Sequence, residues 1–148
     1  MTTGSSRVVR AVDYEYMRRV ASNVFHALGS GHVENIYHKA IVLDVMSDGI
    51  KCECEKVLPI WYKNTQIGVV RADIFLNDEI IVELKAVALV QPAHYQQVRR
   101  YGVLLGTTKM MLINFPTTPG KCMEIFAHME NGEFMRLASP LKRDHEDN

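Results

Sequence analysis

The chain has 148 residues, of which 47% are hydrophobic, and this is enough to form one globular domain around a sizeable core. Its 17 Lys and Arg residues balance its 17 Asp and Glu residues, so the formal net charge is zero. This composition excludes a general basic field that would attract a phosphate backbone. Any contact with nucleic acid therefore needs a local patch or a metal ion.

No stretch of about 18 apolar residues and no secretory leader is visible in the sequence. We therefore expect an intracellular protein without membrane association, cytoplasmic, or nuclear if the source is eukaryotic or viral. The three cysteines, Cys52, Cys54 and Cys122, are odd in number and lack the second ligand pair of a zinc site. We expect them to be buried free thiols.

The chain divides into three parts by composition. Residues 1–10 are small and polar at their start and are predicted to be flexible, whereas residues 139–148 form a charged tail that is also predicted to be flexible. Residues 11–138 are predicted to form a single domain. Within it, Asp13 can cap a first helix over residues 13–28, and a second helix follows Gly31 over residues 32–46.

Strands are predicted over residues 50–60, 67–76 and 80–87, with a turn at Asn64 and Thr65 between the first two. Pro92 suits the first turn of a helix over residues 92–105. A buried strand over residues 109–115 and a hairpin that turns at Asn131 and Gly132 complete the domain. A helix between two strands suits a parallel crossover, so the order predicts an α/β fold with a mixed β-sheet flanked by helices.

Charged residues interrupt two of these apolar strands. Asp73 lies within the second, and Glu83 and Lys85 point to one face of the third. A two-residue turn after Leu76 would place Asp73 and Glu83 on opposite faces. A three-residue loop over residues 77–79 would place them directly opposite each other, within about 5 Å. We predict the three-residue loop, because Asn and Asp tolerate the left-handed conformation that it needs.

Two carboxylates this close repel each other unless a cation lies between them. Mg²⁺ or Mn²⁺ suits the arrangement, since hard ions prefer carboxylate oxygen, and Lys85 could then orient an attacking water or stabilise a phosphate. The alternative is an ordinary cross-strand arrangement of Glu and Lys on a solvated face.

The spacing of Ala72-Asp73 and Glu83-Leu84-Lys85 resembles that of the PD-(D/E)XK nuclease superfamily, whose core runs helix, three strands, helix, strand (α-β-β-β-α-β). The run Gly31-His32-Val33-Glu34-Asn35-Ile36-Tyr37 is similar to the signature of its GxxExxY family. The similarity extends over residues 13–130, up to and beyond Gln97 and Tyr101, and it implies a restriction-endonuclease-like core.

The resemblance implies a role for each matching position. Asp73, Glu83 and the backbone carbonyl of Leu84 would hold Mg²⁺ or Mn²⁺, and Glu34 would face the ion directly or through water. Lys85 would be the catalytic lysine and Gln97 a further polar residue of the site. Alternatively, Glu34 could serve only its helix end, and Gln97 could belong to an ordinary amphipathic helix.

The expected activity is hydrolysis of nucleic acid, with DNA expected rather than RNA. Further candidate contacts to nucleic acid are Tyr101, Arg99, Arg100 and His94, although exposed arginines on a helix are usually only solvated. A non-catalytic module that binds nucleic acid or protein on a nuclease scaffold is the alternative function. A homodimer and protein partners also stay open.

Overall fold

The computed structural model describes residues 12–138. The predicted flexible ends, residues 1–10 and 139–148, lie outside the described residues. The helices are α2 (Tyr14–Leu28), α3 (Glu34–Ser47) and α4 (Pro92–Leu105). The strands are β1 (Cys52–Tyr62), β2 (Thr65–Leu76), β3 (Ile80–Lys85), β4 (Met110–Asn114), β5 (Glu124–His128) and β6 (Phe134–Leu137). All the predicted elements are present, with shifts of a few residues at their ends.

Local sequence signals explain where the helices begin and end. The Asp13 carboxylate accepts a hydrogen bond from the Tyr16 backbone N–H and caps α2, as predicted. Pro92 occupies the first turn of α4, and Gly106 ends that helix in the left-handed conformation with φ 72°. These signals fix the length of α4, which connects β3 to β4.

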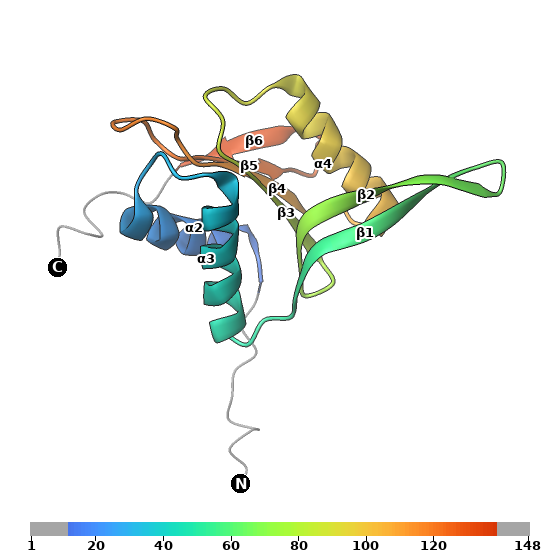
Figure 1. Cartoon of the computed structure of the whole chain (residues 1–148), viewed down its shortest axis with the longest axis horizontal. Coiled ribbons are helices and arrows are strands. Elements are labelled where there is room, and N and C mark those ends of the chain that lie inside the picture. Colours follow the sequence, from blue (N-terminus) through green and yellow to red (C-terminus); the bar gives the residue numbers. More distant parts are fainter. Residues whose placement is uncertain (1–11, 139–148) are drawn as a thin grey trace, which may run out of the picture.

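The strands form one six-stranded mixed sheet in the order β1-β2-β3-β4-β5-β6. Only β3 and β4 are parallel, because the crossover through α4 joins them, and every other neighbouring pair is antiparallel. Helices cover both faces of the sheet, with α2 and α3 on one side and α4 on the other (Figure 1). The predicted α/β fold with a mixed sheet flanked by helices is confirmed.

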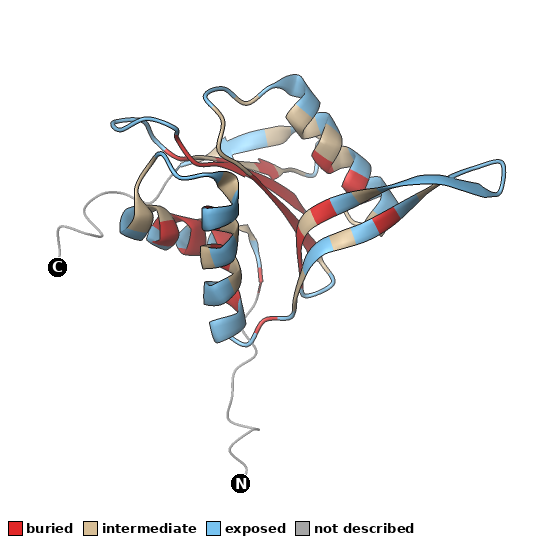
Figure 2. Cartoon of the chain, in the orientation of Figure 1, coloured by how far each residue is buried: buried red, intermediate tan, exposed pale blue. Residues whose placement is uncertain are grey.

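Two hydrophobic clusters fill the space between these layers. The larger joins α2 and α3 to the sheet and includes Tyr37, Ile41 and Ile74. The smaller joins α4 to the opposite face and includes Val98 and Phe75. Figure 2 shows the buried residues concentrated in the central strands and on the inner sides of the helices. Within residues 12–138, no helix is long and apolar enough to cross a membrane.

The hairpin between β1 and β2 differs from its prediction in one detail. Tyr62 pairs with Thr65, so the turn consists of Lys63 and Asn64, with φ 48° and 63°, rather than Asn64 and Thr65. Two consecutive left-handed residues produce a tight turn whose twist matches that of the strands. β1 consequently ends two residues later than predicted and β2 begins two residues earlier, and they extend as a two-stranded ribbon away from the rest of the sheet (Figure 1).

The prediction of buried thiols is wrong, although the three cysteines are free. Cys54 and Cys122 are exposed and Cys52 is half-buried. Cys52 and Cys54 lie on β1, which is an edge strand, and Cys122 lies in the loop before β5. Cys52 packs against the cluster beneath α2 and α3 and is therefore covered in part. Burial and the neighbouring Cys54 raise the pKa of the Cys52 thiol to about 12.

Candidate metal and catalytic site

The register between β2 and β3 brings Asp73 to Glu83. Leu76 pairs with Ile80, and the two pairs that follow leave Asp73 and Glu83 as the next opposing residues. The loop between these strands has three residues, and Asn77 and Asp78 both adopt φ 54°. The predicted three-residue loop is confirmed, and the left-handed conformation of Asn77 and Asp78 is what makes it possible.

At this point side chains replace the backbone pairing of the two strands. The Leu84 N–H donates to Asp73 Oδ2 over 3.1 Å, and the Asp73 N–H donates to Glu83 Oε1 over 3.4 Å. The regular ladder between β2 and β3 ends at Ile74 and Val82. Each carboxylate is therefore fixed to the strand that carries the other, which holds both acids at the point where the strands separate.

The pairing of β2 with β1 is also interrupted at Asp73. Glu55, which lies opposite Asp73 in this register, adopts φ 49° and makes no ladder pair. Strict alternation predicts Ala72 on the same face as Ile74. Instead, Ala72 packs with Phe75 in the cluster beneath α4, whereas Ile74 packs beneath α2 and α3. That prediction is wrong because the ribbon rotates where the ladder is broken.

Glu83 is a deeply buried acid, with 3% of its surface exposed. Burial, followed by the negative charge of Asp73, raises its pKa from 4.5 to about 8, and the Lys85 ammonium offsets part of this effect. Glu34 adds a smaller repulsion. At neutral pH, Glu83 therefore holds its proton unless a cation enters beside it.

Glu34 approaches the same point from the first turn of α3, where the positive end of the helix dipole favours a carboxylate. Its pKa is raised by burial and by the charge of Asp73, and lowered in part by Lys85. The preceding Val33 makes no side-chain cap. The three acids and Lys85 thus act on one another electrostatically, whereas their role as one metal and catalytic site stays a prediction.

Lys85 lies between the acids and α4. Its Nζ donates to Gln97 Oε1 over 3.0 Å and lies 3.6 Å from Glu83 Oε2. The Tyr101 hydroxyl, one turn farther along α4, has its pKa raised to about 12 by burial and by the charge of Glu83, while a hydrogen bond from the Gln97 side chain acts in the opposite direction. Residues of α4 therefore hold the lysine and form one wall of the site.

The remaining candidate residues on α4 have other contacts. His94 Nδ1 accepts from the Gln91 N–H over 2.9 Å and so caps the helix, and burial followed by the Lys85 charge lowers the pKa of its imidazole. Arg99 donates to the Gly132 carbonyl over 3.1 Å and lies over the Phe134 ring. Arg100 is exposed. Contact of these residues with nucleic acid stays a prediction.

The Gly31-x-x-Glu34-x-x-Tyr37 motif has a clear structural role. Gly31 has φ 91°, a conformation that other residues rarely adopt, and its N–H donates to the Pro116 carbonyl over 3.0 Å. The fully buried Tyr37 donates to the Gly29 carbonyl over 2.6 Å, and its ring stacks on Phe115 at 4.0 Å. Together these contacts fix the loop before α3 and thereby the position of Glu34.

Asn114 is a buried polar residue near the site that was not predicted from the sequence. Asn114 is 2% exposed and pairs with Lys85 across the parallel strands. Its amide group exchanges two hydrogen bonds with the backbone of Val87 and donates to the Glu124 carboxylate over 3.0 Å. Asn114 therefore positions the chain directly after Lys85. The sequence signal that could have indicated its role is a single Asn directly after the apolar run 110–113.

The donor set fits a hard divalent cation. Ionised Glu34, Asp73 and Glu83 with protonated Lys85 carry a net charge of −2, and burial makes this charge costly without a counter-ion. Within residues 12–138, no group of three or more His, Cys, Asp or Glu side chains lies close enough together to hold a metal ion. An ion would therefore rely on water and on backbone oxygen, such as the Leu84 carbonyl, for further ligands.

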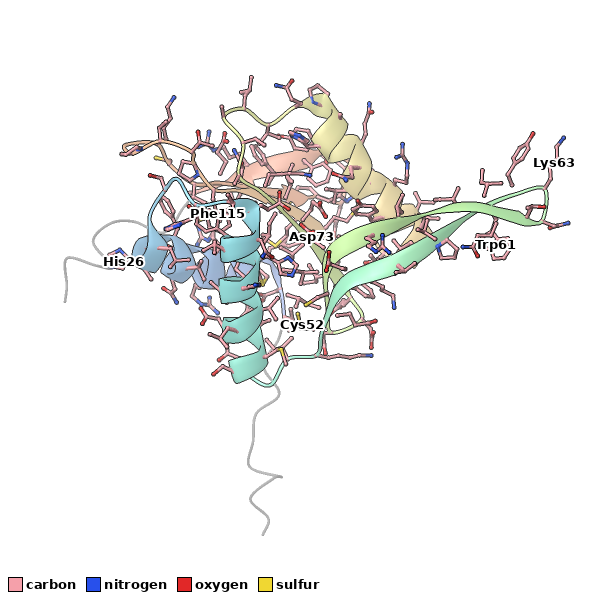
Figure 3. The ribbon with its side chains drawn as sticks, viewed as in Figure 1. His26, Cys52, Trp61, Lys63, Asp73 and Phe115 are labelled. Atoms are coloured by element: carbon pink, nitrogen blue, oxygen red, sulfur yellow. The ribbon has the colours of Figure 1, made fainter. Side chains whose placement is uncertain are left out.

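Figure 3 shows Asp73 at the base of the β1–β2 ribbon, next to α3.

In a comparison with known protein families, the family model described as the PD-(D/E)XK nuclease superfamily matches residues 13–125. No curated protein sequence matches the chain. A solved structure titled "Crystal structure of SSO0001" shares 16% identity, with 86% of this chain and 72% of that chain covered and a TM-score of 0.40.

Proposed function

Because the chain belongs to the PD-(D/E)XK nuclease superfamily, we propose that it is a metal-dependent nuclease that hydrolyses phosphodiester bonds in DNA. We also propose that it belongs to the GxxExxY branch of that superfamily. The fold is the restriction-endonuclease-like α/β fold of the superfamily. One observation supports the proposal best: the half-buried Asp73 lies opposite the buried Glu83 beside Lys85, and burial followed by the charge of Asp73 raises the pKa of Glu83 to about 8.

Asp73, Glu83 and the Leu84 carbonyl would hold Mg²⁺ or Mn²⁺, with Glu34 as a further ligand, directly or through water. The bound ion would lower the pKa of a water molecule and neutralise charge on the phosphate. Glu83 must lose its proton before it can act as a ligand. Asp73, whose Oδ2 is held by the Leu84 N–H, presents its other carboxylate oxygen in a fixed direction.

Lys85 supplies the positive charge beside the reacting phosphate. Gln97 accepts from its Nζ and so orients the ammonium group, which can stabilise negative charge on phosphorus or orient the attacking water. Tyr101, whose pKa is raised from 10.0 to about 12, keeps its proton at neutral pH, so its hydroxyl is available as a donor. We propose that Gln97 positions Lys85 and that Tyr101 contacts the phosphate backbone.

The experiment is nicking of supercoiled plasmid and of single-stranded circular DNA with Mg²⁺, Mn²⁺ or EDTA. Asp73→Asn and Lys85→Met should each abolish cleavage. The matched controls are Asp78→Asn and Lys51→Met, which remove an exposed ion pair 2.8 Å long from the neighbouring loop and should cleave normally. An RNA substrate of the same sequence tests the preference for DNA.

Cleavage that survives both Asp73→Asn and Lys85→Met would contradict the assignment. Tight binding of DNA without turnover in any metal would instead favour a non-catalytic binding module on a nuclease scaffold. Light scattering of the same samples would report any homodimer.

A further inference from the structure

The β1–β2 ribbon extends beyond the sheet as an arm, defined here as residues 56–71. β3 pairs with β2 only over Ile74, Phe75 and Leu76, so from Asp73 outward the ribbon has no third strand. Figures 1 and 2 show that the arm projects from the body and is exposed over most of its length. A two-stranded ribbon without further cover is marginally stable on its own, so a long one needs a functional reason.

The arm exposes large apolar and aromatic side chains. Trp61 is 61% exposed, Tyr62 is 59% exposed and Ile67 is 63% exposed. Val57 and Val69 lie closer to the body and are 51% and 41% exposed. Exposed apolar side chains grouped in this way are typical of a binding surface.

The arm is also basic, although the whole chain is neutral. Residues 56–71 contain Lys56, Lys63 and Arg71 but no Asp or Glu, which gives the arm a formal charge of +3. Lys56 pairs with Glu53, whereas Lys63 lies 5.3 Å from the centre of the Tyr62 ring. Arg71 is exposed and precedes Asp73 by two residues.

One face of the arm runs from Arg71, two residues from Asp73, toward the tip. Val57 pairs with Arg71 and Pro59 pairs with Val69, so these four side chains share a face. The register shifts between Ile60 and Trp61, and the exposed Trp61 follows this regular stretch toward the tip. The opposite face carries Leu58 and Val70, which pack in the cluster beneath α4. Trp61 lies six residues beyond the position opposite Asp73, or about 20 Å at ~3.3 Å per residue. Figure 3 shows Asp73 at the base of the arm and Trp61 and Lys63 toward its tip.

We propose that the arm binds an unpaired strand of the nucleic-acid substrate, with a base stacked on Trp61 and phosphates at Lys63 and Arg71. This inference rests on the proposed nuclease function and specifies its substrate as DNA with a single-stranded segment. Arg71 then holds the phosphate backbone where the strand enters the site at Asp73. The free strand runs along the outer face of the arm toward its tip.

The chemistry of this face favours an unpaired strand over a duplex. Valine, proline and tryptophan side chains offer no row of hydrogen-bonding groups that could read base edges in a groove. Aromatic rings bind the faces of bases, which only an unpaired strand exposes, and positive charge follows its backbone. A second copy of the chain is disfavoured as the occupant, because two arms of charge +3 would repel each other.

The single tryptophan makes the proposal directly measurable, since Trp61 reports on the arm alone. The Asp73→Asn protein in EDTA is titrated with single-stranded oligothymidylate of roughly 15 nucleotides and with a blunt duplex. The single strand should quench Trp61 fluorescence, and the duplex should not. Fluorescence anisotropy of labelled DNA should show about 5- to 100-fold weaker binding for Trp61→Ala and partial recovery for Trp61→Phe.

Variants that remove a positive charge test the path of the DNA phosphate backbone along the arm. Lys63→Ala and Arg71→Ala should each weaken binding and reduce the dependence of log Kd on log salt by about 0.7. The matched controls are Leu43→Ala, an exposed apolar residue on α3, and Arg19→Ala, an exposed cation on α2, which should bind normally.

Binding is measured without cleavage, so the two proposals fail separately. Single-stranded DNA that binds without quenching, with full affinity in Trp61→Ala, would overturn the role of the arm even if the enzyme cleaves DNA. An absence of any binding would also overturn it. A blue shift of Trp61 fluorescence with rising protein concentration, together with a doubled mass in light scattering, would assign the arm to a second copy. If single-stranded DNA quenches Trp61 fluorescence but the wild-type protein cleaves no DNA, the result would support DNA binding by the arm and contradict the proposed nuclease activity.

Discussion

Replacement of Glu83 by glutamine tests the electrostatics of the site in the metal-free protein. Glutamine has the same shape but cannot ionise, and it retains an oxygen that can accept from the Asp73 N–H. The wild-type carboxyl is 3% exposed and lies beside Asp73. Removal of its charge should therefore stabilise the protein at high pH, although the residue is proposed to be essential for activity.

The magnitude follows from the pKa of Glu83. A rise from 4.5 to about 8 corresponds to about 5 kcal/mol at ~1.36 kcal/mol per pKa unit. This value is the net cost of ionisation and already includes the attraction to Lys85, whose Nζ lies 3.6 Å from the carboxylate. We therefore expect Glu83→Gln to increase the free energy of unfolding by about 2–4 kcal/mol at about pH 8.

The stabilisation by Glu83→Gln should grow with pH. Below about pH 4.5 the Glu83 carboxyl is protonated in both the folded and the unfolded wild type, so the substitution should have little effect. Between about pH 4.5 and pH 8 the unfolded chain releases this proton while the folded protein retains it. The contribution of Glu83 to wild-type stability is therefore present at low pH and is lost as the pH rises through about 8.

Urea unfolding in EDTA, followed by circular dichroism at about pH 4.5, 6 and 8, measures this effect. The control is Glu130→Gln, an exposed residue before β6, which should change the free energy of unfolding by less than about 0.5 kcal/mol. A Glu83→Gln protein that is less stable than the wild type at pH 8, or has an equal pH dependence, would refute the reasoning.

Three further predictions concern the site and its supports. The affinity for Mn²⁺, measured by calorimetry, should increase from about pH 6 to pH 8 as the ion displaces the Glu83 proton, and a pH-independent affinity would contradict this. Tyr37→Phe removes a buried hydroxyl that makes two hydrogen bonds, so urea unfolding should show a loss of about 1–3 kcal/mol, against less than about 0.5 kcal/mol for the exposed Tyr62→Phe. Gly102→Ala places a Cβ 2.5 Å from a methionine sulfur and 2.9 Å from a backbone carbonyl oxygen and should cost about 1–3 kcal/mol. At Gly68 an added Cβ meets nothing within 4 Å, so equal costs for Gly68→Ala and Gly102→Ala would contradict the steric argument.

The sequence predicted the elements well because their signals are local. Asp13, Pro92 and Gly106 mark helix ends through the conformation of their own backbone or their nearest neighbours. The register of β2 and β3 was predictable as well, because Asn77 and Asp78 suit a left-handed loop of the required length.

The features that the sequence did not reveal depend on tertiary contacts. The rotation of the ribbon at Asp73 arises where Glu55 leaves the ladder, and no local signal marks Glu55 for a positive φ. The partners of Asn114 come from two other segments of the chain. The exposure of Cys54 follows from the edge position of β1, which only the complete sheet order defines.

Anomalous diffraction from crystals grown with Mn²⁺ is the measurement that tests the metal site most directly. We predict a peak bound by carboxylate oxygens of Asp73 and Glu83, at about 2.0–2.3 Å, with the Leu84 carbonyl among the remaining ligands. A crystal saturated with Mn²⁺ that shows no peak there, with Glu83 still accepting from the Asp73 N–H, would contradict the account.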